Sequence, residues 1–158
     1  MSENPVSPTR ALPVYLVEDD EVVLRACAQA IKLADIPVRS FHNAEQALAA
    51  LSDDPPCIIV SDVRMPGLSG LELLERMRTL DRDVPVILIT GHGDVSMAVQ
   101  AMRAHAYDFI EKPFNSARLI DVIRRAQEKR ALIQENQRLR QQLGNLCGLF
   151  IRSLTAGF

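Results

Sequence analysis

The sequence predicts an α/β protein in which five strands alternate with helices around a mostly parallel sheet. Two observations lead to this class. Short apolar runs recur along the chain, and segments with apolar residues at helical spacing lie between them. Proline, glycine and Asn/Asp clusters separate the two kinds of segment. This alternation is typical of a doubly wound sheet with helices on both faces and right-handed crossovers.

The first half of the chain supplies two strand–helix units and the third strand. We expect strands at residues 12–17, 38–41 and 57–62, with helices at 21–34 and 44–51. Asn43 is a good N-cap for the second helix, and Gln46 stands three residues later to complete a capping box. The third strand is apolar without alternation, which indicates burial on both faces, and it ends at Asp62.

The second half completes the pattern. Ser69 and Asp94 are expected to cap helices that run to about residues 78 and 102. The fourth and fifth strands are predicted at 86–90 and 107–111, and a long helix begins at Asn115 or Ser116. Five strands in this rhythm favour the flavodoxin-like strand order 2-1-3-4-5, a (βα)5 fold with an extended C-terminal helix.

Composition sets limits on the class of protein. The chain has 158 residues, 47% of them hydrophobic, and a net charge of -2, so no global basic field favours nucleic acid or an anionic membrane. No run approaches the roughly 18 apolar residues of a membrane span. Three widely spaced cysteines suit reduced thiols and a cytoplasmic location. Residues 1–10 are polar and are expected to form a disordered lead-in.

Chemically useful side chains stand where the predicted strands end. The first strand is followed by Glu18 and Asp19, the third ends at Asp62, the fourth ends at Thr90, and Lys112 follows the fifth. Parallel strands bring their carboxyl ends to one edge, where ligands bind in open α/β sheets. Three carboxylates there repel one another unless a cation intervenes, and oxygen ligands favour Mg²⁺.

Each of these residues also has a plain structural interpretation. Acids such as Glu18 and Asp19 are favoured at helix N-termini, and Thr90 alone is an ordinary strand-end hydroxyl. Their joint occurrence at strand ends favours a site instead. A lysine and a hydroxyl suit a phosphoryl group, and an aspartate can become an aspartyl phosphate. The pattern therefore predicts magnesium-assisted phosphoryl transfer, with Asp62 as the nucleophile.

Four segments, VYLVEDD, VSDVRMPG, ILITGHGD and YDFIEKPF, resemble the receiver domain of two-component response regulators over about residues 10–130. The resemblance implies that Asp62 is phosphorylated by a sensor histidine kinase. It further implies an acidic pocket of Glu18 and Asp19, with Mg²⁺ held by Asp19, Asp62 and the main-chain carbonyl of Arg64. The implied switch residues are Thr90 and Phe109. Lys112 is expected to bind the phosphoryl group, and the peptide bond before Pro113 is expected to be cis.

Two positions depart from that family pattern. Phe109 lacks the hydroxyl that a tyrosine would offer at the aromatic switch position, so any reorientation there must be driven by packing. His105 stands where many relatives have glycine, and a positive φ at this position would strain a histidine. We expect His105 at the surface, at a helix C-terminus.

The last helix is longer than the fold requires. Residues 115–143 contain no Gly or Pro and would span about 43 Å as a helix. Alternating steps of four and three residues form a heptad seam of Leu132, Asn136, Leu139, Leu143 and Leu146. Asn136 at an a position favours a parallel, in-register dimer. We therefore expect a homodimer through this helix and the face around the fourth and fifth strands. The alternative is a solvated helix protruding from a monomer.

This suffix resembles the linker of sigma-54-dependent activators, and among them most resembles the C4-dicarboxylate transport regulators. The expected organisation is a lead-in at 1–10, a receiver domain at 11–128, a coiled-coil linker at 129–147, and a tail at 148–158 that is either a cut linker edge or vector-derived. The sequence contains no G-x-x-x-x-G-K-[ST] motif, so ATPase and DNA-binding outputs are expected only through domains absent from it.

Other readings remain open. One is the receiver of a nitrogen-fixation-type helix-turn-helix regulator, although such proteins lack an extended heptad linker. Another is a stand-alone receiver. A third is a metal-dependent phosphatase, but such enzymes need a second acid two residues after the nucleophile, where this chain has Arg64. The sequence therefore favours a signalling switch over an enzyme.

Overall fold

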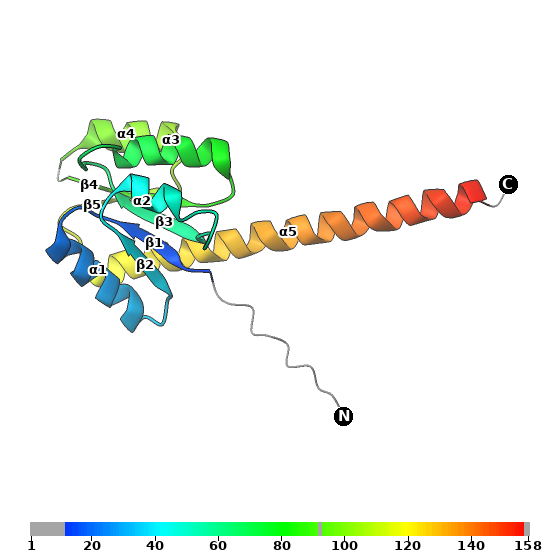
Figure 1. Ribbon diagram of the computed structural model, residues 1–158, viewed down its shortest axis with the longest axis horizontal. Coiled ribbons are helices and arrows are strands. Elements are labelled where there is room, and N and C mark those ends of the chain that lie inside the picture. Colours follow the sequence, from blue (N-terminus) through cyan, green and yellow to red (C-terminus); the bar gives the residue numbers. More distant parts are fainter. Residues whose placement is uncertain (1–11, 92, 157–158) are drawn as a thin grey trace, which may run out of the picture.

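A computed structural model describes residues 12–91 and 93–156, so the whole of the predicted lead-in at 1–10 and the last two residues lie outside the described part. A parallel sheet with strand order β2-β1-β3-β4-β5 forms the centre of the domain (Figure 1). Its strands are β1 (Val14–Val17), β2 (Val38–Phe41), β3 (Ile58–Asp62), β4 (Val86–Thr90) and β5 (Asp108–Glu111). The predicted class and strand order are confirmed.

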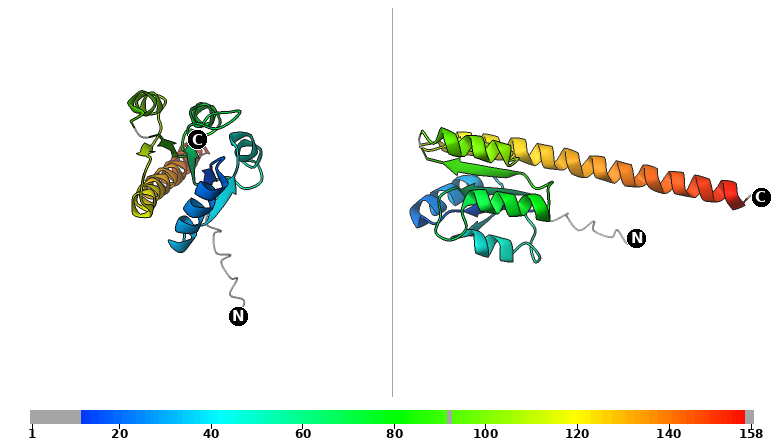
Figure 2. Two further views of the ribbon diagram at one scale, coloured as in Figure 1. Left: turned by 90° about the vertical axis from the view of Figure 1, so that its left-hand side faces the viewer. Right: turned by 90° about the horizontal axis from the view of Figure 1, so that it is seen from above.

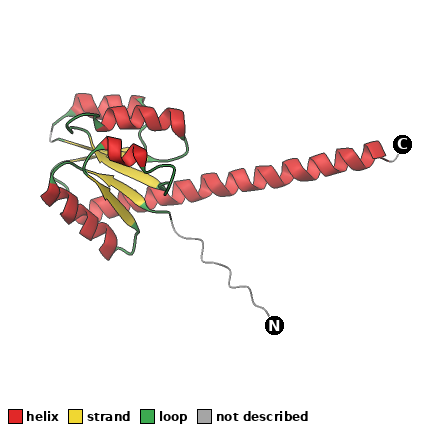
Figure 3. Ribbon diagram, viewed as in Figure 1, coloured by secondary structure: helices red, strands yellow, loops and turns green. Residues whose placement is uncertain are grey.

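Helices cover both faces of this sheet, as Figures 2 and 3 show. They are α1 (Glu21–Leu33), α2 (Ala44–Ala49), α3 (Gly70–Leu80), α4 (Val95–Arg103) and α5 (Ser116–Ala156). Side chains of α1 and α5 share one apolar core with about half of the buried hydrophobic strand residues, and those of α2, α3 and α4 pack into the other core with the remainder. Strands β1, β3 and β4 are buried at every residue because both of their faces are covered.

The predicted caps explain where several helices begin. Asn43 accepts a hydrogen bond from the Gln46 backbone N–H at 2.8 Å, and Ser69 and Asp94 act in the same way for α3 and α4. The capping box is only half formed, because the Gln46 side chain accepts from the N–H of His42 and not from that of Asn43. Most predicted element boundaries agree with the structure to within two residues.

Two features at helix ends bear on the predictions. His105 follows α4 with a φ of 66°, so this exposed histidine occupies the left-handed conformation that glycine would hold at lower cost. Helix α5 continues through Ala156, beyond the predicted end of the linker helix at residue 147, and includes Gly144 and Gly148. The predicted tail is therefore helical as far as residue 156. No helix in the described ranges has the length and apolar character needed to cross a membrane.

Candidate functional site

The polar residues predicted at the strand ends lie together at the carboxyl edge of the sheet. Glu18 directly follows β1, Asp62 ends β3 and Thr90 ends β4, and all three are buried. Lys112 comes directly after β5. The parallel register aligns these ends, with Asp62 opposite Ile89 and Thr90 opposite Glu111. Strand topology therefore brings together residues that are far apart in the sequence.

Three of these residues form a carboxylate cluster. Glu18, Asp19 and Asp62 each offer an oxygen, and these oxygens lie within 4.8 Å of one another. Glu18 is 2% exposed and Asp62 is 8% exposed, so water screens their repulsion weakly. One Glu18 oxygen accepts the Asp20 backbone N–H at 3.1 Å, and Oε2 has no hydrogen-bond partner among the described residues.

This donor set fits a hard divalent cation. Carboxylate oxygens are the ligands that Mg²⁺ prefers, and Oε2 of Glu18 is a buried acceptor that receives no hydrogen bond from the described residues. Burial, together with the neighbouring Asp62 carboxylate, raises the pKa of Glu18 to about 7. The predicted contribution of the Arg64 main-chain carbonyl to such a site stays a prediction. The Arg64 side chain turns elsewhere and pairs with Asp94, with Nη2 3.1 Å from Oδ2.

Lys112 supplies a positive charge to this cluster. Its Nζ lies 3.2 Å from Oδ2 of Asp62 and 3.7 Å from Oε2 of Glu18. Burial disfavours the charged ammonium, but the carboxylates of Asp62 and Glu18 outweigh it and raise the pKa of Lys112. The peptide bond between Lys112 and Pro113 is cis, as the family resemblance implied. The lysine therefore stays charged beside the Asp62 carboxylate at neutral pH.

The two predicted switch residues lie beside this site on neighbouring strands. Thr90 is 2% exposed, and its backbone carbonyl accepts the Lys112 backbone N–H at 2.8 Å. Phe109 is half-buried at a surface cleft of about 440 Å³ between α4 and β5. The other residues that line this cleft are Val95, Ala98, Val99, Met102 and Arg103. The surroundings of Phe109 are thus mainly apolar.

Two residues near the site were not anticipated from the sequence. The Glu111 carboxylate accepts the backbone N–H of Gly93 at 2.6 Å and so ties the segment after β4 to the end of β5. Gly70 begins α3 directly against Asp62, where an added Cβ would lie 2.2 Å from the Asp62 carbonyl oxygen. A glycine right after a capping serine was the available signal for this close approach.

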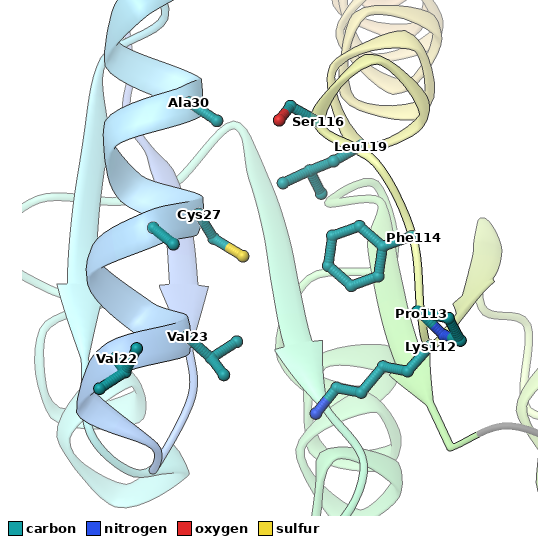
Figure 4. Close-up of a pocket in the computed structure, with 10 residues that line it drawn as sticks. Val22, Val23, Cys27, Ala30, Lys112, Pro113, Phe114, Ser116 and Leu119 are labelled. Atoms are coloured by element: carbon teal, nitrogen blue, oxygen red, sulfur yellow. The ribbon is translucent and has the colours of Figure 1, made fainter.

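A groove of about 550 Å³ opens beside the site between α1 and the start of α5 (Figure 4). Its walls are mostly apolar, and Lys112 lies at one end of it. The side chains that line it include Val22, Val23, Cys27, Phe114 and Leu119. An apolar surface therefore leads directly to the charged cluster.

Comparison with known proteins gives concordant matches. The model of the response regulator receiver domain matches residues 14–124. The C4-dicarboxylate transport transcriptional regulatory protein DctD of Rhizobium meliloti is 51% identical over 128 residues, which are 81% of this chain and 28% of that protein. The transcriptional regulatory protein FixJ of the same species is 44% identical over 115 residues, 73% of this chain and 56% of FixJ.

Solved structures agree with these sequence matches. NtrX from Brucella abortus superposes with a TM-score of 0.76 at 37% identity, covering 82% of this chain and 30% of NtrX. The FixJ-N crystal structure gives a TM-score of 0.70 at 44% identity and covers 74% of this chain and 94% of its own. The chain thus spans less than a third of DctD and about half of FixJ.

Proposed function

The chain belongs to the family of response regulator receiver domains, and on this basis we propose that it is a phosphorylation-controlled switch with Asp62 as the phosphoryl acceptor. The main support for this role is the position of Asp62. Its carboxylate ends β3, lies 3.2 Å from the Lys112 ammonium and shares a cluster with Glu18 and Asp19. A sensor histidine kinase is the proposed donor.

The proposed reaction is a direct phosphoryl transfer. An Asp62 carboxylate oxygen bonds to phosphorus while the bond from phosphorus to the donor histidine nitrogen breaks, which leaves an acyl phosphate on Asp62. Lys112 faces a transferred phosphoryl oxygen, and the Thr90 hydroxyl turns toward another. Mg²⁺, held by Asp19, Asp62 and the Arg64 carbonyl with Glu18 completing the acidic pocket, would offset charge on the phosphoryl oxygens.

The same site favours a switch over a turnover enzyme. Arg64 stands two residues after Asp62, where a metal-dependent phosphatase would place its second acid, and its side chain pairs with Asp94. Without that acid, the acyl phosphate is expected to persist rather than to be hydrolysed rapidly. All three cysteines are free thiols, which suits a protein of the reducing cytoplasm.

We assign the output to the α4–β5 face and the extended part of α5. Val95, Val99 and Met102 are exposed on α4, and Leu132, Leu139 and Leu143 are exposed on α5. A homodimer through these surfaces would bury them, with residues 11–128 as the receiver and 129–147 as the coiled-coil linker. Inverting a two-state equilibrium from 1:99 to 99:1 takes about 5.5 kcal/mol, and new charge-assisted hydrogen bonds to the phosphoryl group could contribute to it.

The sigma-54-dependent output is proposed by analogy with the DctD proteins, and DNA and polymerase contacts would belong to domains outside this chain. The receiver of a helix-turn-helix regulator is the second candidate, supported by the 44% identity to FixJ. Sedimentation of the full chain and of a chain that ends at residue 128, each with and without beryllofluoride as a phosphoryl mimic, separates the two. A dimer that depends on residues 129–147 favours the first candidate, and a chain whose association is independent of them favours the second.

Phosphorylation of Asp62 is tested with Mg²⁺ and a small phosphodonor. We expect one phosphoryl group per chain, located at Asp62 by mass spectrometry, and none in Asp62→Asn. Asp121→Asn, an exposed acid on α5 that pairs with Arg125, is the matched control and should be labelled like the parent. Labelling that persists in Asp62→Asn would refute the assignment.

A further inference from the structure

We infer that the loop between α3 and β4, residues 81–85, braces helix α5 where this helix leaves the domain and fixes its rotation. The braced helix presents its apolar seam, defined as Leu132, Asn136, Leu139 and Leu143, away from the domain. A function for this outward-facing seam rests on the homodimer proposed above. Figures 1 and 2 show α5 lying against the sheet beside α1 and then continuing far beyond the domain.

Two acids of the loop contact the helix. Asp81 pairs with Arg130, with Oδ2 3.7 Å from Nη2, and the Arg130 side chain is only 14% exposed. The Gln137 amide nitrogen donates to Oδ2 of Asp83 at 2.6 Å. Arg130 and Gln137 are seven residues apart, or about 10 Å along a helix. Two contacts at this separation restrain the direction of the helix as well as its position.

Hydrogen bonds fix the conformation of the loop independently of its contacts with α5. The Asp83 backbone N–H donates to Oδ1 of Asp81 at 3.0 Å, which leaves Oδ2 of Asp81 for Arg130. Arg78 on α3 donates to the backbone carbonyls of Arg82, at 3.0 Å, and Val84. The loop acids are therefore already in place when they meet the helix, and less conformational freedom is lost in making the contacts.

Helical geometry then fixes where the seam points. Successive residues are rotated by about 100°, so Arg130 and Gln137 lie on nearly the same side of α5. Leu132 and Leu139 each come two residues later and lie about 200° around the helix from the braced side. Their exposed fractions, 71% and 46%, agree with this direction. The brace and the seam occupy opposite sides of the same helix.

A second copy of the chain is the partner that this surface fits. The seam is apolar at three of four positions. Its one polar residue, Asn136, pairs best with Asn136 of a second copy in an in-register dimer. Because each domain sits on the side opposite the seam, two helices paired through it would carry their domains on the outside. A third contact links the same stretch of helix to the domain, since the Lys129 ammonium lies 5.4 Å from the centre of the Tyr107 ring, just before β5.

The brace is tested by distance measurements between spin labels. One label is placed on exposed Cys147 and the other on Glu75→Cys of α3, with Cys27→Ala and Cys57→Ser so that only these two thiols remain. Excess unlabelled chain ensures that each distance lies within one molecule. We expect a narrow distribution in the parent and a broadened one in Asp83→Ala and in Gln137→Ala. Gln142→Ala changes an exposed glutamine about 120° around the helix from Arg130 and should match the parent.

Sedimentation of the same variants separates the brace from the dimer. Loss of the brace should raise the dimer dissociation constant about fivefold, which corresponds to about 1 kcal/mol. A monomeric parent whose distribution is narrow and broadens in Asp83→Ala supports the brace and refutes the proposed dimer. Distributions in Asp83→Ala and Gln137→Ala that are as narrow as in Gln142→Ala would overturn the brace.

Discussion

The carboxyl edge of the sheet and the extended part of α5 place their side chains in different ways. At the sheet edge, Glu18, Asp62 and Thr90 come from three strands and are nearly inaccessible to water. Leu143 and Leu146 on the helix extension are both 62% exposed. The sheet fixes the neighbours of each strand-end residue. For these two leucines the helix fixes only a direction, and their packing partners must come from outside the domain.

This difference predicts that substitutions in the two regions change different quantities. A change in the domain should alter the free energy of unfolding or the chemistry at Asp62. A change in the extension should alter association and leave both of those unaffected. The four predictions below test this separation.

The largest effect is expected from Ile87→Ala on β4. Ile87 is fully buried in the core shared with α1 and α5, and truncation there leaves a cavity. We expect the free energy of unfolding to fall by about 4 kcal/mol, measured by urea denaturation. Leu139→Ala on the extension is the control and should change domain unfolding by less than about 0.5 kcal/mol. Equal losses in the two variants would mean that the extension belongs to the folding unit.

The second prediction concerns Lys112→Ala. Removing the ammonium 3.2 Å from Asp62 leaves the carboxylate cluster without its nearest cation and the transferred phosphoryl group without a charged donor. The rate of labelling by a small phosphodonor should fall about 100-fold, the typical cost of losing one such donor. Lys129→Ala, at the opposite edge of the sheet beside Tyr107, should label at the parental rate. A parental rate in Lys112→Ala would rule out this role for the lysine.

The sequence predicted which residues lie at the carboxyl edge of the sheet, because the order of parallel strands determines which residues meet there. Asp62 and Lys112 are 50 residues apart, yet the pattern of apolar residues places both at strand ends. Because the strands are parallel, these ends meet at the same edge of the sheet. The contact of Glu111 with Gly93 was missed because it depends on the path of a loop, which periodicity does not encode. The contacts of Asp81 and Asp83 with α5 were missed because they depend on the angle at which the helix passes a neighbouring loop.

The third prediction follows from the raised pKa of Glu18. Because this pKa rises from 4.5 to about 7 on folding, the folded chain binds more protons than the unfolded chain between these values. The contribution of Glu18 is therefore fully present below pH 4.5 and is lost as pH rises through about 7. Without divalent cations, the free energy of unfolding should fall by roughly 2 kcal/mol from pH 5 to pH 8.

Glu18→Gln is the matched control for this pH dependence, since it keeps the shape of the side chain and removes the titration. Its free energy of unfolding should vary less over the same interval, measured by urea denaturation at each pH. A parental slope in Glu18→Gln would assign the pH dependence to another group.

The smallest effect comes from one substitution made in both regions. Gly144 lies inside α5 with no atom within 4 Å of an added Cβ, so Gly144→Ala should stabilise the extension by about 1 kcal/mol. Helicity measured by circular dichroism should rise, and domain unfolding should stay unchanged. At Gly70 an added Cβ would meet the Asp62 carbonyl at 2.2 Å, so Gly70→Ala should destabilise the domain and slow labelling. The same added methyl group thus stabilises the helix at Gly144, where no atom is near, and destabilises the domain at Gly70, where the Asp62 carbonyl already occupies the space. Two losses of similar size would contradict the distinction between the regions.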